Sequence, residues 1–107
     1  MTLPVRTGIG AYILDENGVP VPEPDIVAWG RWFETHSRHI ALGHEGDARV
    51  STVFLELDHR FFGEGAPVLF ETMIFGGRHD SYQERYTTSA EAEAGHARAL
   101  AMVKETP

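Results

Sequence analysis

The chain has 107 residues, 42% of them hydrophobic and 23% charged, a composition typical of one globular domain and not of a disordered or fibrous protein. Its 16 acidic and 9 basic side chains give a formal charge of −7, which argues against a nucleic-acid partner because such proteins present a cationic face to the phosphates. No apolar run is long enough to span a membrane, and the absence of cysteine excludes disulfides, thiolate metal sites and cysteine nucleophiles.

The N-terminal part predicts a β-hairpin. Ile9–Leu14 reads as a strand, and Asp15–Gly18 supplies the residues of a tight turn. The alternating prolines of Val19–Pro24 favour extended backbone. Because proline donates no hydrogen bond to a ladder, this second arm is expected to be an edge strand.

The next segment predicts a helix from about Asp25 to Thr35. Ile26, Trp29, Trp32 and Phe33 share one helical face, and Asp25 has the side chain of an N-cap. We interpret the aromatic residues of this face as core anchors.

The middle of the chain predicts strands at 38–43, 49–58 and 67–75, with 82–87 as a further outer strand. Glycines and a proline lie in the link before the third strand, so the 50–58 and 67–75 segments are expected to pair as an antiparallel hairpin. A second helix is predicted from Thr88 to about Lys104, because Thr88-Ser-Ala-Glu91 matches the capping-box pattern.

The alternation along the long hairpin predicts two different faces. One face is interpreted as core and carries Val53, Leu55, Leu57, Val68, Phe70 and Ile74. The other mixes large apolar groups with carboxylates and carries Phe54, Glu56, Asp58, Leu69, Glu71, Met73 and Phe75. This mixed face is our candidate partner-binding surface, together with the adjacent aromatics Phe61 and Phe62 of the link.

The three carboxylates Glu56, Asp58 and Glu71 allow two interpretations. They are either a site for acid–base chemistry or a divalent cation, or rim charges around a buried or self-associating patch, paired with Arg60, Arg78 or Arg85. Nothing near them resembles a nucleophile or a phosphate cradle, so we favour the rim interpretation and assign no catalytic residue.

The six histidines have no spacing typical of a metal site, and we therefore expect neither a structural metal nor a cofactor. They are His36, His39, His44, His59, His79 and His96.

Five stretches resemble a group of small proteins of bacteriophages, prophages and environmental bacteria that have no assigned activity. The matching residues are Tyr12–Gly18 with Pro20-Val21, Asp25 with Trp29–Glu34, Val50–Leu55 with Leu57–His59, Leu69–Gly77, and Arg85–Thr88 with Glu91-Ala92 and Gly95-His96. In that group a Trp commonly follows the Arg-Tyr-Ser/Thr-Thr stretch, whereas this chain has Ser89-Ala90. The resemblance implies a phage or prophage accessory protein.

Together these observations predict one α+β domain spanning 1–107, an antiparallel sheet of four to five strands with two helices packed on one face. The N-terminal residues have no secretion-signal pattern, so a cytoplasmic protein of the host cell is expected.

Three functions stay open: a non-enzymatic module that binds a host or phage protein and interferes with it or with a defence complex, a structural or assembly component of the virion, and a small enzyme using a carboxylate or histidine. The mixed face has to be covered by something, so it predicts either a homodimer or a monomer that keeps this face for its partner.

Overall fold

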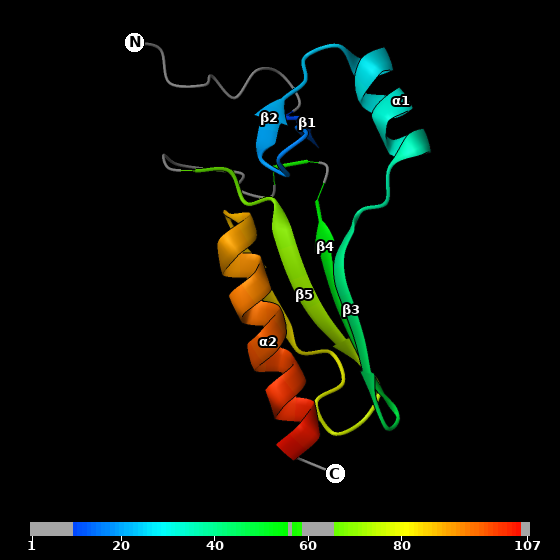
Figure 1. Cartoon of the computed structure of the whole chain (residues 1–107), viewed down its shortest axis with the longest axis vertical. Coiled ribbons are helices and arrows are strands. Elements are labelled where there is room, and N and C mark those ends of the chain that lie inside the picture. The colour runs from blue at the N-terminus through cyan, green and yellow to red at the C-terminus, as the bar shows by residue number, and fades with distance from the viewer. Residues whose placement is uncertain (1–9, 56, 59–65, 106–107) are drawn as a thin grey trace.

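The computed structural model describes residues 10–55, 57–58 and 66–105, which form an α+β fold (Figure 1). Four antiparallel strands make one sheet in the order β3 (His39–Glu45), β4 (Ala48–Phe54), β5 (Phe70–Phe75) and β6 (Gln83–Tyr86). A separate two-stranded hairpin consists of β1 (Tyr12–Leu14) and β2 (Pro20–Pro22), and the helices are α1 (Ile26–Thr35) and α2 (Ser89–Glu105). The predicted fold class is confirmed.

The two helices differ in what they cover. α2 runs along one face of the four-stranded sheet and packs against all of its strands. The expectation that both helices share this face does not hold for α1, which packs against β1 beyond the end of the sheet. This stacking of hairpin and α1 above the sheet makes the molecule elongated, with extents of 49 × 31 × 21 Å.

The hairpin forms as its sequence predicts. The Asp15 carboxylate accepts the backbone N–H groups of Asn17 and Val19 at 2.8 and 2.9 Å, and Gly18 takes the positive φ of 76° that closes the turn. The partner of β1 is a strand with prolines at both ends, Pro20 and Pro22, and no third strand joins this ladder among the described residues. On the other side of the hairpin, Ala11 forms an isolated antiparallel bridge with Leu57, and the two sheets stay separate.

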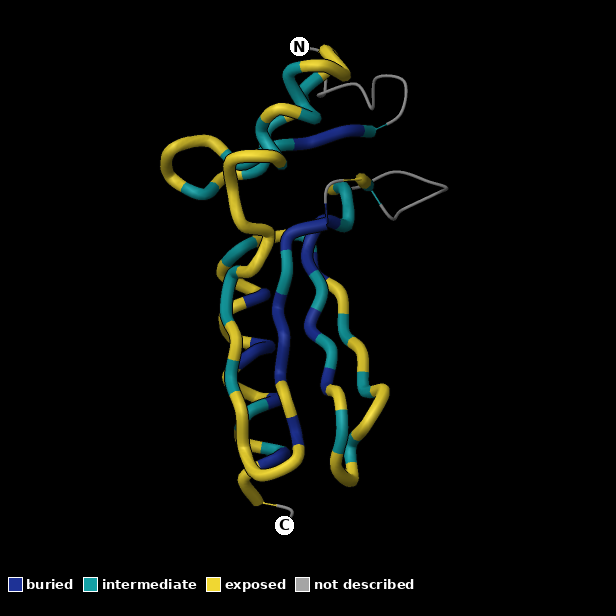
Figure 2. The backbone as a smooth tube through the Cα atoms, turned by 90° about the vertical axis from the view of Figure 1, so that its right-hand side faces the viewer, coloured by how far each residue is buried: buried dark blue, intermediate teal, exposed yellow. Residues whose placement is uncertain are grey.

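The buried face of the sheet is set by the pairing of β4 with β5. Val50, Thr52 and Phe54 lie opposite Ile74, Thr72 and Phe70, and the side chains of all six are fully buried. Figure 2 shows this buried layer between α2 and the sheet.

The predicted core set was correct for Phe70 and Ile74 and wrong for Val53 and Leu57. Val53 pairs with Glu71 on the opposite face, and Leu57 lies beyond the end of β4 and is 39% exposed. Leu55 also lies past the last residue of β4 but is buried, and its N–H donates to the Leu69 carbonyl at 2.6 Å.

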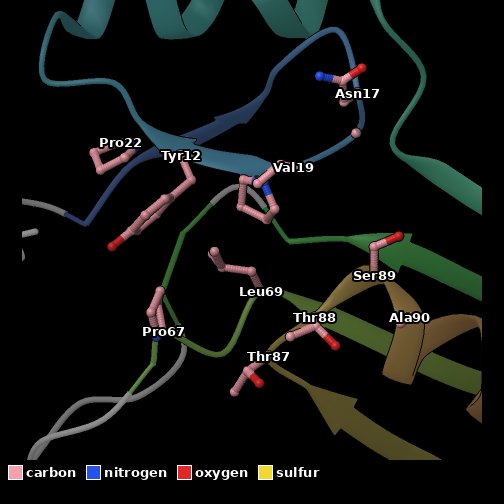
Figure 3. A pocket seen from close by; sticks show the side chains of 12 residues that line it. Tyr12, Asn17, Val19, Pro22, Pro67, Leu69, Thr87, Thr88, Ser89 and Ala90 are labelled. Atoms are coloured by element: carbon pink, nitrogen blue, oxygen red, sulfur yellow. The ribbon is translucent and has the colours of Figure 1, made fainter.

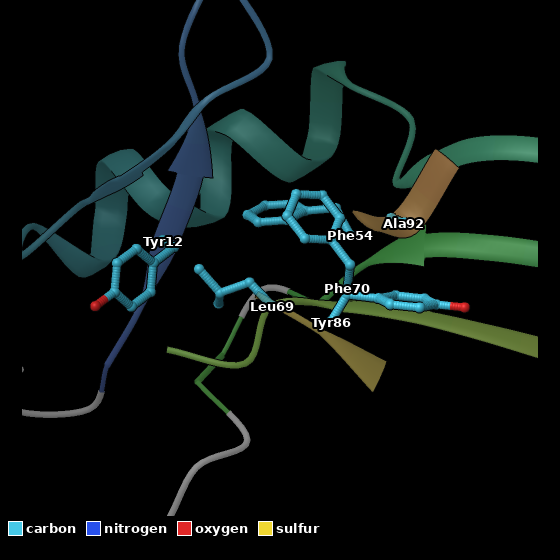
Figure 4. Packing of buried hydrophobic residues seen from close by; sticks show 6 residues of the cluster. All are labelled: Tyr12, Phe54, Leu69, Phe70, Tyr86 and Ala92. Carbon is cyan, nitrogen blue, oxygen red and sulfur yellow. The ribbon is translucent and has the colours of Figure 1, made fainter. Parts of the chain in front are cut away.

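At the upper end of the sheet, the hydrophobic core joins the hairpin to the sheet (Figure 4). The Phe54 ring lies 5.7 Å from the Phe70 ring and 5.9 and 6.2 Å from Trp32 and Phe33 of α1, centroid to centroid. The predicted aromatic anchors of α1 thus reach the core from its edge, and none of the residues of α1 is fully buried.

α2 begins with the predicted capping box. The Thr88 hydroxyl accepts the Glu91 N–H, and the Glu91 carboxylate accepts the Thr88 N–H, both at 3.1 Å. Further along, Gly95 lies against the Tyr86 ring so closely that a Cβ at this position would overlap the phenol. Gly95 therefore lets α2 approach β6. Neither described helix is long and apolar enough to cross a membrane.

Candidate interaction surface

The second face of the four-stranded sheet, which we call the open face, is covered by neither helix. Residues paired across antiparallel strands point to the same face, so the register assigns its members. They are His39, Leu42 and His44 of β3, Arg49, Ser51 and Val53 of β4, Glu71, Met73 and Phe75 of β5, and Gln83 and Arg85 of β6.

An apolar stripe lies on three of the four strands of the open face, β3, β4 and β5. Leu42 is 53% exposed and Phe75 is 39% exposed, while Val53 and Met73 are half-buried. Ser51 at the centre is 8% exposed and is covered by its larger neighbours. The stripe thus consists of apolar side chains on three adjacent strands, grouped around the nearly buried Ser51.

The single carboxylate of the open face is neutralised within the face. Glu71 accepts hydrogen bonds from Gln83 and from the Arg85 guanidinium, the latter at 2.9 Å. The Glu71 side chain is only 12% exposed, whereas Arg85 is 43% exposed. Of the arginine partners predicted for the carboxylates, Arg85 is confirmed.

A second arginine lies at the other end of the stripe. The Arg49 guanidinium carbon lies 4.7 Å from the centroid of the Phe75 ring, a cation–π contact between cross-strand partners. With two arginines, one paired carboxylate and two histidines, the open face lacks the negative charge that the rest of this chain carries.

The predicted partner-binding residues separate into three groups. Glu71, Met73 and Phe75 lie together on the open face. The assignment of Phe54 and Leu69 to that surface was wrong, because both are buried in the core, at 0% and 1% exposure. The predicted pairing of odd positions of β4 with even positions of β5 is one residue out of register, and this turns Phe54 to the opposite face. Leu69 instead precedes β5 and packs in the upper core.

Asp58 does not join the open face either. Its carboxylate accepts the Val68 N–H at 2.9 Å, and its own N–H donates to the Gly10 carbonyl at 3.0 Å. Asp58 therefore ties the residues before the hairpin to the segment that enters β5. The remaining candidates, Glu56, Phe61 and Phe62, and the alternative pairing residue Arg60 lie outside the described residues.

A buried polar cluster under α2 was not predicted from the sequence. Thr52 and Thr72 bond through their hydroxyls at 2.6 Å, and Thr52 also bonds the Nδ1 of His96 at 2.7 Å. Burial lowers the pKa of His96, because the imidazolium loses its solvation beneath the helix. Thr52 is fully buried, so its hydroxyl has no access to a substrate and the cluster joins α2 to the sheet.

Glu84 forms a second link between β6 and α2. Its carboxylate accepts hydrogen bonds from the Tyr82 and Tyr86 hydroxyls and from Arg98, at 3.0–3.1 Å. Burial raises the pKa of Glu84, but the hydrogen bonds from Arg98, Tyr86 and Tyr82 outweigh it and hold the pKa below its ordinary value. The pKa values of Tyr82 and Tyr86 are raised, first by burial and then by the nearby Glu84 carboxylate.

The described histidines are dispersed. His36 stacks on Trp32 with ring centroids 4.4 Å apart, His39 and His44 stand on the open face, and His96 is buried under α2. In the part of the chain that the structure describes, no group of three or more histidine or acidic side chains is arranged to hold a metal ion.

Comparisons with protein-family models, with curated proteins and with solved structures found no match for this chain.

Proposed function

We propose that this chain is a non-enzymatic protein-binding module, an accessory protein of a phage or prophage, and that the open face is its contact surface. The observation that carries the proposal is the apolar stripe of Leu42, Val53, Met73 and Phe75, which no described segment covers. Large contiguous apolar patches on soluble domains are typically interaction sites.

The composition of the open face supports a protein partner. Aromatic residues, methionine and arginine are enriched at protein interfaces, while acidic residues and lysine are depleted there. Phe75, Met73, Arg49 and Arg85 match the enriched classes, and the one acidic side chain, Glu71, is already paired. A partner therefore meets an apolar centre without having to neutralise a buried charge.

The charges define the partner further. Arg49 lies on Phe75 at one end of the stripe, and Arg85 lies beside Glu71 at the other. A protein surface with an apolar ridge and carboxylates at its ends complements this arrangement. The resemblance to phage and prophage proteins supports a host protein, or a host defence complex, as the source of that surface.

Site-specific photocrosslinking tests the proposal. In the test variant, the photoreactive residue benzoylphenylalanine replaces Phe75 on the open face. In the matched control it replaces Val27, which is 58% exposed on α1. We expect irradiation in the bacterial host to give a discrete adduct from position 75 and none from position 27. Adding Leu42→Lys is expected to abolish the adduct, whereas Val19→Lys, 51% exposed on the hairpin, leaves it unchanged.

The mass and identity of the adduct separate the alternatives. A host protein supports the proposal, and a virion protein assigns the face to assembly instead. An adduct of two 11.9 kDa chains makes the face a homodimer contact. Equal adducts from positions 75 and 27, or no adduct from position 75, contradict the proposal.

A further inference from the structure

A pocket of about 440 Å³ lies between the hairpin and the start of α2 (Figure 3). Val19 and Pro20 line it from the hairpin, Pro67 and Leu69 from the segment that enters β5, and Ser89 and Ala90 from the first turn of α2. Its volume falls in the range of small-molecule sites, about 300–1,000 Å³.

Two features of the fold frame the pocket. The hairpin forms a sheet of its own and meets the chain after β4 through the isolated bridge of Ala11 and Leu57, and a space remains between the hairpin and the start of α2. Leu69 forms a fixed wall, because its side chain is 1% exposed and its N–H donates to the Tyr86 carbonyl at 3.1 Å.

The lining carries no charged side chain, and most of it is aliphatic or aromatic. The hydroxyls of Thr87 and Thr88 line the pocket but already donate to the Glu91 carboxylate, at 2.8 and 3.2 Å. That carboxylate also accepts the backbone N–H groups of both threonines. The start of α2 is therefore neutralised by the chain's own anion, which would repel an acidic ligand.

Two polar side chains of the lining remain for a ligand. Asn17 and Ser89 make no side-chain hydrogen bond within the described part of the chain. A ligand that meets them needs one or two hydrogen-bonding groups on an otherwise apolar body.

We propose that this pocket binds an uncharged, mainly apolar small molecule about the size of two or three fused or linked rings. This site is independent of the open face, and it depends on the geometry of the hairpin over α2 and not on the identity of any protein partner.

A pair of dyes tests both parts of the proposal. N-phenyl-1-naphthylamine is uncharged, and 1-anilinonaphthalene-8-sulfonate is the same ring system with a sulfonate. We expect fluorescence titration of the full chain to give saturable binding of the uncharged dye to one site. The sulfonated dye is expected to bind at least about tenfold more weakly.

Matched variants locate the site. Ala90→Phe places a ring in the pocket, and Ala94→Phe makes the same change one turn further along the exposed side of α2. We expect Ala90→Phe to weaken binding of the uncharged dye by at least about tenfold and Ala94→Phe to leave it unchanged. Val19→Trp fills the pocket from the hairpin side and is expected to act like Ala90→Phe, which guards against a folding defect in α2.

Three results would overturn the proposal. They are unchanged dye binding in both pocket-filling variants, equal affinity for the sulfonated dye, and loss of binding in the open-face variant Phe75→Ser.

Discussion

A comparison of Phe54→Ala with Phe75→Ala tests the register of the sheet. It also tests which side chains belong to the open face. The two phenylalanines stand on adjacent strands but on opposite faces, 0% and 39% exposed. If the register were one residue different, both rings would stand on the same face and the two truncations would cost about the same.

The expected magnitude follows from the surroundings of each ring. Removing the fully buried ring of Phe54 gives up about 1.5–3 kcal/mol of transfer free energy. It also leaves a cavity bordered by the rings of Trp32, Phe33 and Phe70, which raises the expected cost of Phe54→Ala to about 3–5 kcal/mol. Phe75→Ala loses a part-exposed ring and one contact with Arg49, and is expected to cost less than about 1 kcal/mol.

Urea unfolding followed by tryptophan fluorescence measures both free energies, since Trp32 lies against Phe54. Phe54→Leu keeps most of the volume and provides a readable, smaller loss if Phe54→Ala does not fold. A cost for Phe75→Ala equal to or above that of Phe54→Ala would refute the register and remove the basis for the open face.

Three further predictions follow from the core and from α2. Leu55→Ala and Phe70→Ala are each expected to lower the free energy of unfolding by about 2–5 kcal/mol in the same assay, because both side chains are buried, and a loss below about 1 kcal/mol would contradict the core assignment. Gly95→Ala is expected to destabilise the fold by about 1–3 kcal/mol, because the new Cβ overlaps Tyr86. Gly30→Ala on α1, where a Cβ would meet no other atom, is expected to stabilise the fold by up to about 1 kcal/mol. Thermal melts that shift in the same direction for both variants would contradict the close packing of Gly95 on Tyr86. Burial lowers the pKa of His96 in the folded state, so as the pH falls the unfolded chain takes up the proton first. The free energy of unfolding is therefore expected to fall as the pH drops below about 6.5. Urea unfolding at several pH values should show this loss in the control variant His44→Gln but not in His96→Gln.

Local signals in the sequence predicted the elements well. The Asp25 N-cap, the Thr88–Glu91 capping box and the Asp15–Gly18 turn all depend on side chains that bond their own neighbouring backbone. Such bonds need no information about the rest of the fold, and the helix bounds agree with the prediction to within about one residue. β4 and β5 were predicted longer than they are, because apolar residues follow β4 and precede β5, whereas β3 runs two residues beyond its predicted end.

The register could not be predicted from alternation, for two reasons. Leu55 and Leu57 extend the apolar pattern of β4 beyond its last residue, Phe54, and so favour the wrong parity. Thr52 and Thr72 read as solvent-facing residues, yet both are fully buried. Their polarity is satisfied by each other and by His96, 20 and 44 residues away in the sequence. No local pattern contains such a partnership.

The corrected register makes association through the open face easier than the sequence implied. Three carboxylates on one apolar face would repel a second copy or an acidic partner and would lose solvation on contact. Of the two that the structure describes, Glu71 lies on this face and Asp58 does not, and Arg85 and Gln83 satisfy Glu71. The remaining positive charge of the face comes from Arg49 and from the part of the Arg85 charge that the ion pair with Glu71 does not neutralise.

The open face and the pocket have a common structural origin in residues 10–36. A second helix on the far side of the sheet would have buried Leu42, Met73 and Phe75, but the aromatic residues of α1 pack on Phe54 at the end of the sheet instead. The hairpin that precedes α1 forms a separate two-stranded sheet, and Ala11 before β1 makes only an isolated bridge to Leu57 after β4. The N-terminal third therefore closes the upper core, leaves one sheet face uncovered and forms the wall of a pocket over α2. Both surfaces available for binding result from where this segment packs.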